Sequence, residues 1–271
     1  DEIMLQPLVS ADAVLTEDEK ELGVCVIDIG GGTTDIAVYT NGAIRHTAVI
    51  PIAGDLITRD LAQALRTPYT AAERIKIFHG VALENLEGLD EMVEVPSVGD
   101  RLPRQISRRT LASVIGPRVE EILELTLNEL RRAGFPEEVL TSGIVLTGGA
   151  SLLRGVVELA EDVFNLPARI GVPQEVGTLS DRIRNPRYAT VIGLLHAAKK
   201  RAQQNGISAG KPNRRTSNTV AEKPVISKNE KRPTPSPRED DESDDLLLPP
   251  EPVPRKPSWV SRAINWMKNN L

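Results

Sequence analysis

A turn of three glycines between two apolar segments is the feature of this sequence best suited to bind phosphate. Residues 26–35 read VIDIGGGTTD, with Gly30, Gly31 and Gly32 at the centre. Phosphate oxygens need backbone N–H donors at close range, and glycine lets the backbone approach because it carries no side chain. The glycines therefore predict a phosphate-binding turn.

Polar side chains stand on both sides of these glycines. Thr33 and Thr34 follow them and would add hydroxyl donors. Asp28 precedes them at the end of the first strand, where a carboxylate could hold a magnesium-bound water near a terminal phosphate. The alternative interpretation is a glycine-rich hairpin that binds no ligand.

A second glycine turn follows another apolar run far along the chain. Residues 143–151 read GIVLTGGAS, which predicts a buried strand, a turn at Gly148 and Gly149, and a helix that begins just beyond Ser151. A helix N-terminus favours negative charge, so a nucleotide could lie against it. A tight strand-to-helix turn without a ligand gives the same pattern. The two turns together are typical of two walls of one cleft.

A third polar group lies in a predicted helix over residues 71–80. Thr70 would cap this helix, and Glu73 stands at the position that completes a capping box. Glu73 and Lys76 are three residues apart and share one helix face. This segment alone favours a surface ion pair, with a ligand contact as the alternative.

The elements that must position these groups follow from the hydrophobic pattern. Apolar and β-branched runs on either side of the glycine turn, with Asn41-Gly42 as a hairpin signal, predict a three-stranded meander. Pro117 predicts a kink or restart within one long helix. The expected strands are 23–29, 35–40, 43–52 and 143–147, with short strands and a loop within 92–106. The expected helices are 55–65, 71–80, 107–133, 152–164 and 188–201.

Composition excludes several classes of protein. The net charge of −5 argues against a nucleic-acid partner, which usually selects a basic face. The single cysteine, Cys25, excludes an intrachain disulfide and is expected to be buried. No apolar stretch reaches the length of about 18 residues that spans a bilayer. The sequence begins at Asp1 directly in folded-looking sequence, which suggests a piece without its N-terminal part.

The C-terminal quarter has a different character. Residues 201–257 are rich in proline and charge, which predicts a disordered linker. Residues 258–271 predict an amphipathic helix with an apolar arc of roughly 160°. Two tryptophans in this arc suit a lipid headgroup layer, and basic side chains flank it. Docking on a protein groove is the alternative to membrane binding. The membrane-binding candidates are Trp259, Val260, Arg262, Ile264, Trp266, Met267 and Lys268.

Taken in this order, the motifs over residues 1 to about 200 resemble the actin, Hsp70 and hexokinase superfamily. The first glycine turn resembles its second phosphate loop, and Gly148-Gly149 resembles its adenosine loop. The resemblance implies that Glu73 and Lys76 reach the ribose and adenine of ATP. Gly54-Asp55 is similar to the glycine-acid pair after the third strand. Residues 188–193 are similar to the second connecting helix.

Within the superfamily the sequence resembles the FtsA family of bacterial division proteins, through residues 6–8, 13–23 and 146–150. The resemblance implies an α/β, actin-like (ribonuclease H-like) fold: the second domain and the returning end of the first, then the linker and the terminal helix. The family's first phosphate loop is absent, and so is its characteristic inserted subdomain that precedes the second phosphate loop. One wall of the nucleotide cleft is therefore expected, without ATP hydrolysis by this chain alone.

The resemblance also implies a function and its partners. ATP with Mg²⁺ would stabilise a non-enzymatic scaffold that self-associates into filaments and tethers the tubulin-like protein FtsZ to the cytoplasmic face of the inner membrane at the septum. The C-terminal tail of FtsZ would bind residues 81–140, with Arg108, Arg109 and Asn128 as contacts. Other division proteins would join later.

The same resemblance divides the chain into five parts. Residues 1–80 would form the core with the second phosphate loop, and 81–140 an inserted small subdomain. Residues 141–200 would carry the adenosine loop and the return to the first domain, followed by the linker over 201–257 and the helix over 258–271. The alternatives are an enzyme of the same superfamily, such as a chaperone-like ATPase or a sugar kinase, and a pilus-assembly adaptor.

Overall fold

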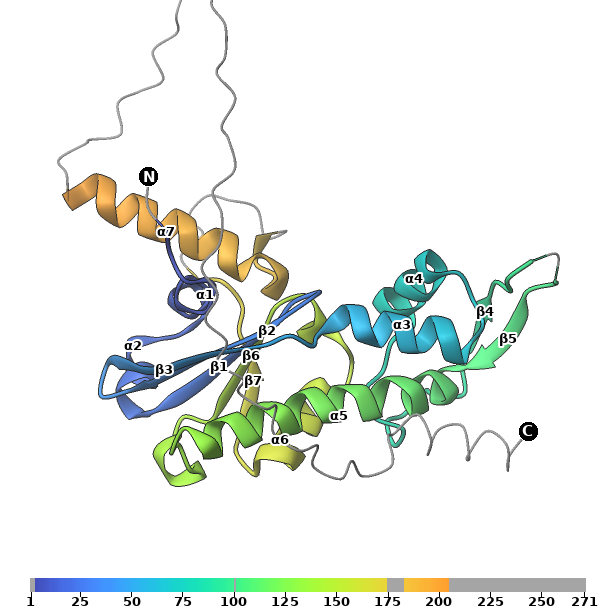
Figure 1. The fold of residues 1–271 in the computed structure, drawn as a ribbon, viewed down its shortest axis with the longest axis horizontal. Helices are drawn as coiled ribbons and strands as arrows, with labels where there is room; N and C mark the ends of the chain where they lie inside the picture. Colours follow the sequence, from blue (N-terminus) through green and yellow to red (C-terminus); the bar gives the residue numbers. More distant parts are fainter. Residues whose placement is uncertain (1–2, 100, 175–182, 205–271) are drawn as a thin grey trace, which may run out of the picture.

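A mixed sheet organises the larger part of the molecule (Figure 1). The computed structural model describes residues 3–99, 101–174 and 183–204, and among these five strands form one sheet in the order β3-β2-β1-β6-β7. β1 and β2 are antiparallel, as are β2 and β3, whereas β6 runs parallel to both β1 and β7. The strands are β1 (Val24–Ile29), β2 (Thr34–Thr40), β3 (Ala43–Ile50), β6 (Ile144–Thr147) and β7 (Ala168–Ile170).

The central strands are apolar because both of their faces are covered. Every residue of β1 is buried, including Cys25, as the sequence predicted. The predicted hairpin is confirmed, since Asn41 and Gly42 both have positive φ, at 52° and 68°. A turn with two positive φ angles matches the twist of the flanking strands. The predicted meander is therefore correct to within two residues at its ends.

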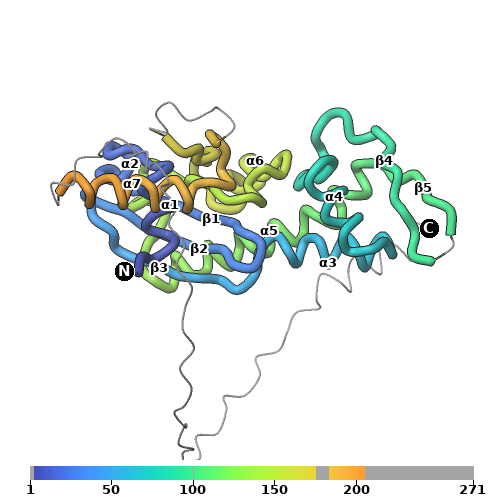
Figure 2. Tube along the Cα trace, turned by 90° about the horizontal axis from the view of Figure 1, so that it is seen from above, coloured from blue at the N-terminus to red at the C-terminus, as the bar shows by residue number. Residues whose placement is uncertain are grey.

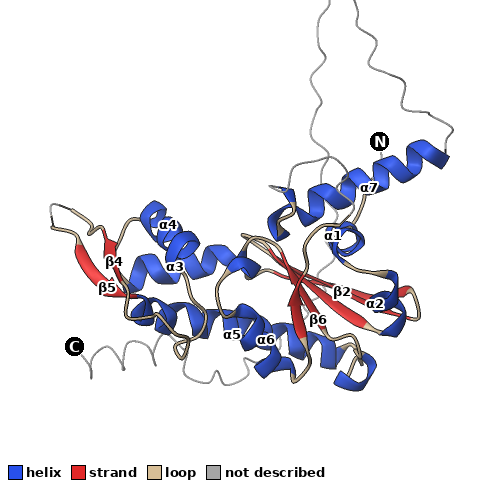
Figure 3. Ribbon diagram, turned by 180° about the vertical axis from the view of Figure 1, so that it is seen from behind, coloured by secondary structure: helices blue, strands red, loops and turns tan. Residues whose placement is uncertain are grey.

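Helices cover the two faces of this sheet (Figure 3). α1 (Gln6–Val14) and α7 (Ala189–Gln204) lie against each other on one face, where Val14, Val24 and Ile192 share a core. α5 (Arg108–Arg132) and α6 (Val156–Phe164) cover the other face. The short helix α2 (Glu17–Leu22) contacts β2. No helix among the described residues is long and apolar enough to cross a bilayer.

A smaller lobe extends from one end of the sheet (Figure 2). It contains two helices, a two-stranded hairpin and the first turns of α5. α5 contacts α3 and β5 in this lobe but also contacts β3 and α6, so one helix joins the two parts. The predicted division of the chain at residues 80 and 140 stays a prediction. The lobe elements are α3 (Gly54–Ala64), α4 (Tyr69–His79), β4 (Met92–Val95) and β5 (Arg104–Ser107).

α5 runs as one continuous helix through Pro117, so the predicted restart is wrong. Ile115 and Val119 are buried on either side of the proline, so both halves of the helix pack into the core, and the predicted kink stays a prediction. The close approach of α5 to the backbone at Ala82 depends on Gly116, since a Cβ there would stand 2.6 Å from the carbonyl oxygen of Ala82. Ser107 caps the helix by accepting a hydrogen bond from the Thr110 N–H.

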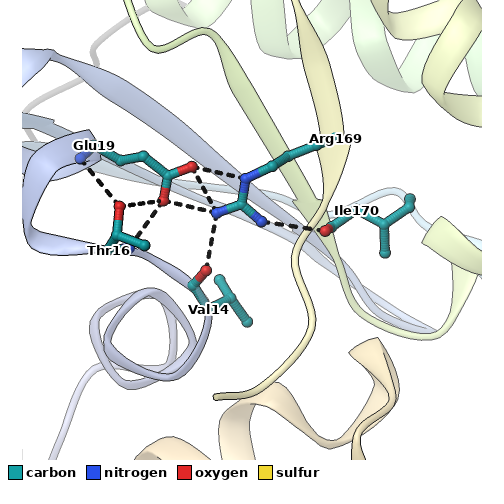
Figure 4. Close-up of polar contacts among 5 residues, drawn as sticks. All are labelled: Val14, Thr16, Glu19, Arg169 and Ile170. Carbon is teal, nitrogen blue, oxygen red and sulfur yellow. Dashed lines mark hydrogen bonds and ion pairs between the residues drawn. The ribbon is translucent and has the colours of Figure 1, made fainter.

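An arginine on β7 fastens the N-terminal helices to the edge of the sheet (Figure 4). The Arg169 guanidinium donates from Nε and Nη2 to the Glu19 carboxylate, each at 2.7 Å, and from Nη2 to the Val14 carbonyl at 3.0 Å. Glu19 also completes a capping box with Thr16 at the start of α2. Burial acts to raise the pKa of Glu19, but the hydrogen bonds from Arg169 and Thr16 outweigh it and hold that pKa below its ordinary value.

Some local predictions are wrong, and some elements were not predicted. The capping box at Thr70 is wrong, because α4 begins at Tyr69 behind Pro68 and has no side-chain cap. The helix expected over 152–164 is also wrong in its start, since α6 begins only at Val156. The helices α1 and α2 and the strand β7 were not expected from the sequence. The predicted linker over 201–257 starts too early, because residues 201–204 belong to α7; its remainder and the predicted terminal helix lie outside the described residues.

Candidate nucleotide-binding site

The two glycine turns meet at one edge of the sheet. β1 and β6 are parallel neighbours in which Asp28 pairs with Thr147, so the turns that follow them emerge side by side. Gly148 has φ +86°, and a Cβ there would stand 2.4 Å from Oδ1 of Asp28. Only glycine fits this position, because a side chain would overlap the aspartate and strain the backbone. The predicted pairing of the two motifs is confirmed in its geometry.

The rims of both turns are open and carry unused hydrogen-bond donors. A Cβ on Gly32 or Gly149 would have no heavy atom within 4 Å. The N–H of Gly30 donates to the Thr33 carbonyl, whereas the N–H groups of Gly31, Gly32, Thr33 and Gly149 donate to no acceptor within the described residues. Exposed N–H groups on a glycine turn are what phosphate oxygens require. The residues present therefore fit a nucleotide phosphate.

The start of α3 is held beneath the first turn. The N–H of Gly54 donates to the Gly30 carbonyl at 3.1 Å, and the N–H of Asp55 donates to the Gly31 carbonyl at 2.8 Å. A Cβ on Gly54 would lie 3.6 Å from Cβ of Ala150, so this helix start also lies beside the second turn. Three segments far apart in sequence thus converge on one place.

Lys76 and Glu73 reach this place from α4 and form the predicted ion pair, but the Lys76 side chain is buried, at 10% exposed, and does not lie on the surface. The Lys76 ammonium donates to the Gly54 carbonyl at 3.0 Å and to Thr58 Oγ1 at 2.8 Å, and it pairs with Glu73 at 2.8 Å. Thr58 donates in turn to Glu73. Burial acts to raise the pKa of Glu73, but the hydrogen bonds from Lys76 and Thr58 outweigh it, so that pKa is lowered.

Thr58 is a site residue that the sequence reasoning missed. Its side chain is fully buried and joins α3 to both charged residues of α4. The sequence does contain a signal: Thr58 follows the Gly54-Asp55 pair by one helical turn, on the face that Gly54 occupies.

Asp28 and Asp35 place two carboxylates beside the first turn. They are partners in the β1–β2 register. Burial raises the pKa of Asp28, the charge of Asp35 raises it further, and hydrogen bonds led by that from Ser10 oppose the rise. Burial also raises the pKa of Asp35, opposed by the hydrogen bond from Thr33 Oγ1, at 2.9 Å. Oxygen ligands of this kind suit a divalent cation held through water.

Two predicted hydroxyl groups turn into the protein. Thr34 Oγ1 donates to the Ile52 carbonyl at 2.7 Å, and Ser151 Oγ donates to the Gly148 carbonyl at 2.8 Å. Both side chains are buried. They stabilise the turns from within and do not present a hydroxyl donor at the open rim, which differs from the expectation for Thr34.

The wall behind the second turn differs from the expected helix N-terminus. A 3₁₀ turn, η2 (Ala150–Leu152), follows Gly149, and Gly155 with φ +85° separates it from α6. The positive φ of Gly155 favours glycine and lets the chain turn between η2 and α6. The donors on this wall therefore come from the turn itself.

The three predicted partner contacts do not form one patch. Arg108 pairs with Glu91 at 3.1 Å and donates to the His79 carbonyl. Arg109 is half exposed, at 52%, and lies beside it. Asn128 is exposed on the same helix, but a separation of about 1.5 Å per residue puts it roughly 30 Å away. Arg108 and Arg109 thus lie at the start of α5 and Asn128 near its other end, and their role as partner contacts stays a prediction.

Comparison with known proteins agrees with this geometry. A profile of the family described as Cell division protein FtsA matches residues 25–193. Proteins named Cell division protein FtsA from Neisseria meningitidis serogroup B, Escherichia coli K12 and Bacillus subtilis 168 are 66%, 51% and 41% identical over 200, 207 and 209 residues. The matches cover 74%, 74% and 77% of this chain and 48%, 49% and 46% of those proteins, so the chain spans about half their length.

Solved structures give the same fold. MreB5 of Spiroplasma citri bound to ADP has a TM-score of 0.61 at 24% identity, over 76% of this chain and 62% of that one. The MamK double helical filament has a TM-score of 0.53 at 18% identity, over 72% of this chain and 58% of that one. These likenesses confirm the predicted actin-like α/β fold. With the family profile and its relatives, they lead to one conclusion: this chain belongs to the FtsA family of cell division proteins.

Proposed function

We propose that the two glycine turns bind the phosphates of ATP with Mg²⁺, and that this site supports a scaffold in bacterial cell division. The observation that carries the proposal is the convergence of two open glycine turns around Asp28, with unused N–H donors at both rims. The MreB 5 structure bound to AMPPNP, which is 25% identical over 74% of this chain, is a nucleotide complex of the same fold and supports it.

Each group has a part that follows from its chemistry. The N–H groups of Gly31, Gly32 and Gly149 would donate to phosphate oxygens. Asp28 would orient water bound to the cation, and the cation would neutralise phosphate charge. Glu73, fixed by Thr58 and Lys76, would supply an acceptor to the ribose and adenine, and Lys76, whose three protons are directed at Gly54, Thr58 and Glu73, would hold that carboxylate in place. Because Thr58 and Gly54 hold Lys76 firmly, these two side chains are preorganised for a ligand.

The wider role is that of a membrane tether without enzymatic activity of its own. The scaffold would self-associate into filaments, bind the C-terminal tail of FtsZ through residues 81–140, and recruit other division proteins at the septum. The terminal helix over residues 258–271 would hold it at the cytoplasmic face of the inner membrane. Family membership supports this role, and the relatives named for cell division share 40–66% identity with the chain.

The nucleotide site is tested by Gly32→Val in the full-length protein. A side chain here meets no protein atom within 4 Å, so the fold should be unaffected while the branched group occupies the space of the phosphate oxygens. Losing two charge-assisted hydrogen bonds predicts at least about 100-fold weaker binding of fluorescent ATP. Unchanged affinity for ATP, with an unchanged thermal midpoint of unfolding, would mean that this turn does not bind the phosphates. Gly31→Val is a poorer test, because its Cβ would meet Asp55 at 3.2 Å.

The membrane tether is tested by liposome co-sedimentation. Ile264→Glu puts a charge in the predicted apolar arc, and Asn269→Glu puts the same charge on the predicted polar side. We expect the first to release the protein from anionic liposomes and the second to leave most of it bound, because the apolar arc supplies most of the binding. Equal sedimentation of both variants would mean that another segment holds the membrane.

The partner site is tested by Arg109→Glu, with Asn128→Glu as a control on the far part of the same helix. An acidic peptide that copies the FtsZ tail should bind Arg109→Glu several-fold more weakly, and more so at low salt, where exposed charges are less screened. If the Asn128 variant loses affinity and the Arg109 variant does not, the contact lies at the other end of α5.

A further inference from the structure

Two hydroxyl groups from separate helices converge on the aspartate of the site. Ser10 of α1 donates to Oδ2 of Asp28 at 2.7 Å and lies 2.9 Å from Thr190 Oγ1 of α7. Thr190 also makes a longer contact of 3.4 Å with Oδ2. Ser10 is completely buried, and Asp28 is 3% exposed. The remaining oxygen, Oδ1, faces the second glycine turn at Gly148.

The backbone of the two helices is shaped to bring these hydroxyls together. A Cβ on Gly193 would stand 1.8 Å from the carbonyl oxygen of Val9, so α7 crosses α1 at van der Waals contact of their main chains. Val9 adjoins Ser10, and Gly193 lies one turn after Thr190 on the same helix face. The crossing therefore places one hydroxyl from each helix against the same carboxylate oxygen.

A buried carboxylate with one oxygen held in this way has little rotational freedom. Since Ser10 donates its proton to Asp28, its oxygen can accept from Thr190, and the two hydroxyls form a chain that ends on Oδ2. Hydrogen bonds to a charged group are stronger than neutral ones and fix its orientation. As a consequence, α1 and α7 hold Oδ2 of Asp28 and thereby fix the direction of its other oxygen, Oδ1.

We propose that Ser10 and Thr190 are positioning residues that orient Asp28 toward the hydrated magnesium ion of a bound nucleotide, and that the α1–α7 crossing thereby sets the metal dependence of nucleotide binding. The inference rests on the proposed function, because it assigns a task to residues around the same site. It adds two helices to the groups that control the ligand.

The test compares Mg-ATP with ATP in EDTA, measured by fluorescent-ATP titration of the full-length protein. Ser10→Ala and Thr190→Val should each weaken Mg-ATP binding, by about tenfold for Ser10, because a hydrogen bond to a charged group is lost. Binding in EDTA should change less than twofold. Thr190→Ser keeps the hydroxyl and should restore the metal preference. Thr126→Val removes a buried hydroxyl that donates within α5 to Ile122 and should change neither measurement.

The outcomes separate a positioning role from a structural one. If Ser10→Ala and Thr190→Val weaken both forms of ATP equally, the hydroxyls act on the fold and the inference is overturned. If neither variant changes the Mg-ATP affinity, the inference is overturned while the proposed nucleotide site stands. Failure of the wild-type protein to bind ATP would overturn the proposed function and this inference with it. Should Ser10→Ala unfold, Thr190→Val at its partly exposed position carries the same comparison.

Discussion

Gly148 and Asp28 belong to adjacent parallel strands and approach so closely that a Cβ on the glycine would stand 2.4 Å from the carboxylate. Its neighbour Gly149 has helical φ and ψ of −66° and −35° and open space around it. We expect Gly148→Ala to lower the free energy of unfolding by about 3 kcal/mol through backbone strain and overlap. Gly149→Ala should leave it unchanged or raise it by about 0.4–1 kcal/mol, because the unfolded chain loses freedom.

The same pair separates folding from binding. Gly149→Ala should bind Mg-ATP more weakly than the wild type, although it is at least as stable, because its methyl group enters the open rim. Urea unfolding and ATP titration measure the two effects. Equal stability of the two variants would contradict the close contact between the turns.

The Glu19–Arg169 pair predicts a pH-dependent part of the stability. The pKa of Glu19 lies below its ordinary value in the folded protein, so its contribution is present above the unfolded pKa and is lost as pH falls through the folded one. Glu19→Gln should therefore lower the free energy of unfolding by about 1 kcal/mol at pH 7. The value is modest because Arg169 is partly exposed.

As the pH falls through the lowered pKa of folded Glu19, the wild type and Glu19→Gln should converge on the same denaturant midpoint, because Glu19 becomes protonated. Glu124→Gln, at an exposed position of α5, serves as the control and should differ little from the wild type at any pH. A difference in stability between Glu19→Gln and the wild type that did not shrink as the solution was acidified would show that packing, and not the ion pair, is responsible.

Asp60 and Arg118 join α3 to α5 in a nearly buried ion pair. Arg118 donates from Nε at 2.6 Å and from Nη2 at 3.2 Å to the Asp60 carboxylate, and each side chain is 10% exposed. Asp60→Ala removes one carboxylate that neutralises the buried Arg118 guanidinium, so it should lower the free energy of unfolding by about 3 kcal/mol. Arg132→Ala breaks the exposed pair with Glu129 and should cost less than about 1 kcal/mol. Equal losses in thermal unfolding would contradict the burial of the first pair.

The sequence predicted most of the fold where local chemistry decides the structure. Asn41-Gly42 gave the hairpin because both residues tolerate positive φ. The apolar spacing along α5 predicted its bounds to within one residue, from 107–133 to Arg108–Arg132. α1 was missed because it lies between the sheet and α7 and is buried on several sides, which removes the one-faced pattern that marks a surface helix.

Tertiary contacts explain what the sequence could not predict at the site. Glu73 stands at a capping-box spacing from Thr70, but Thr58 and Lys76 engage its carboxylate, so no cap forms. Ser10 carries no motif of its own, because its significance comes from Thr190 and Asp28, which are distant in sequence. The glycines were predictable, since a turn of that shape has few alternatives.

Hydrogen exchange of the full-length protein with and without Mg-ATP tests the central claim most directly. The N–H groups of Gly31, Gly32 and Gly149 have no acceptor within the described residues, so nucleotide should slow their exchange in both turns at once. The hairpin loop over residues 96–99, away from both turns, should exchange at an unchanged rate. Slower exchange in residues 30–33 and 148–151 together is the result that the account predicts. Protection of one turn alone, or of neither while ATP is bound, would contradict it.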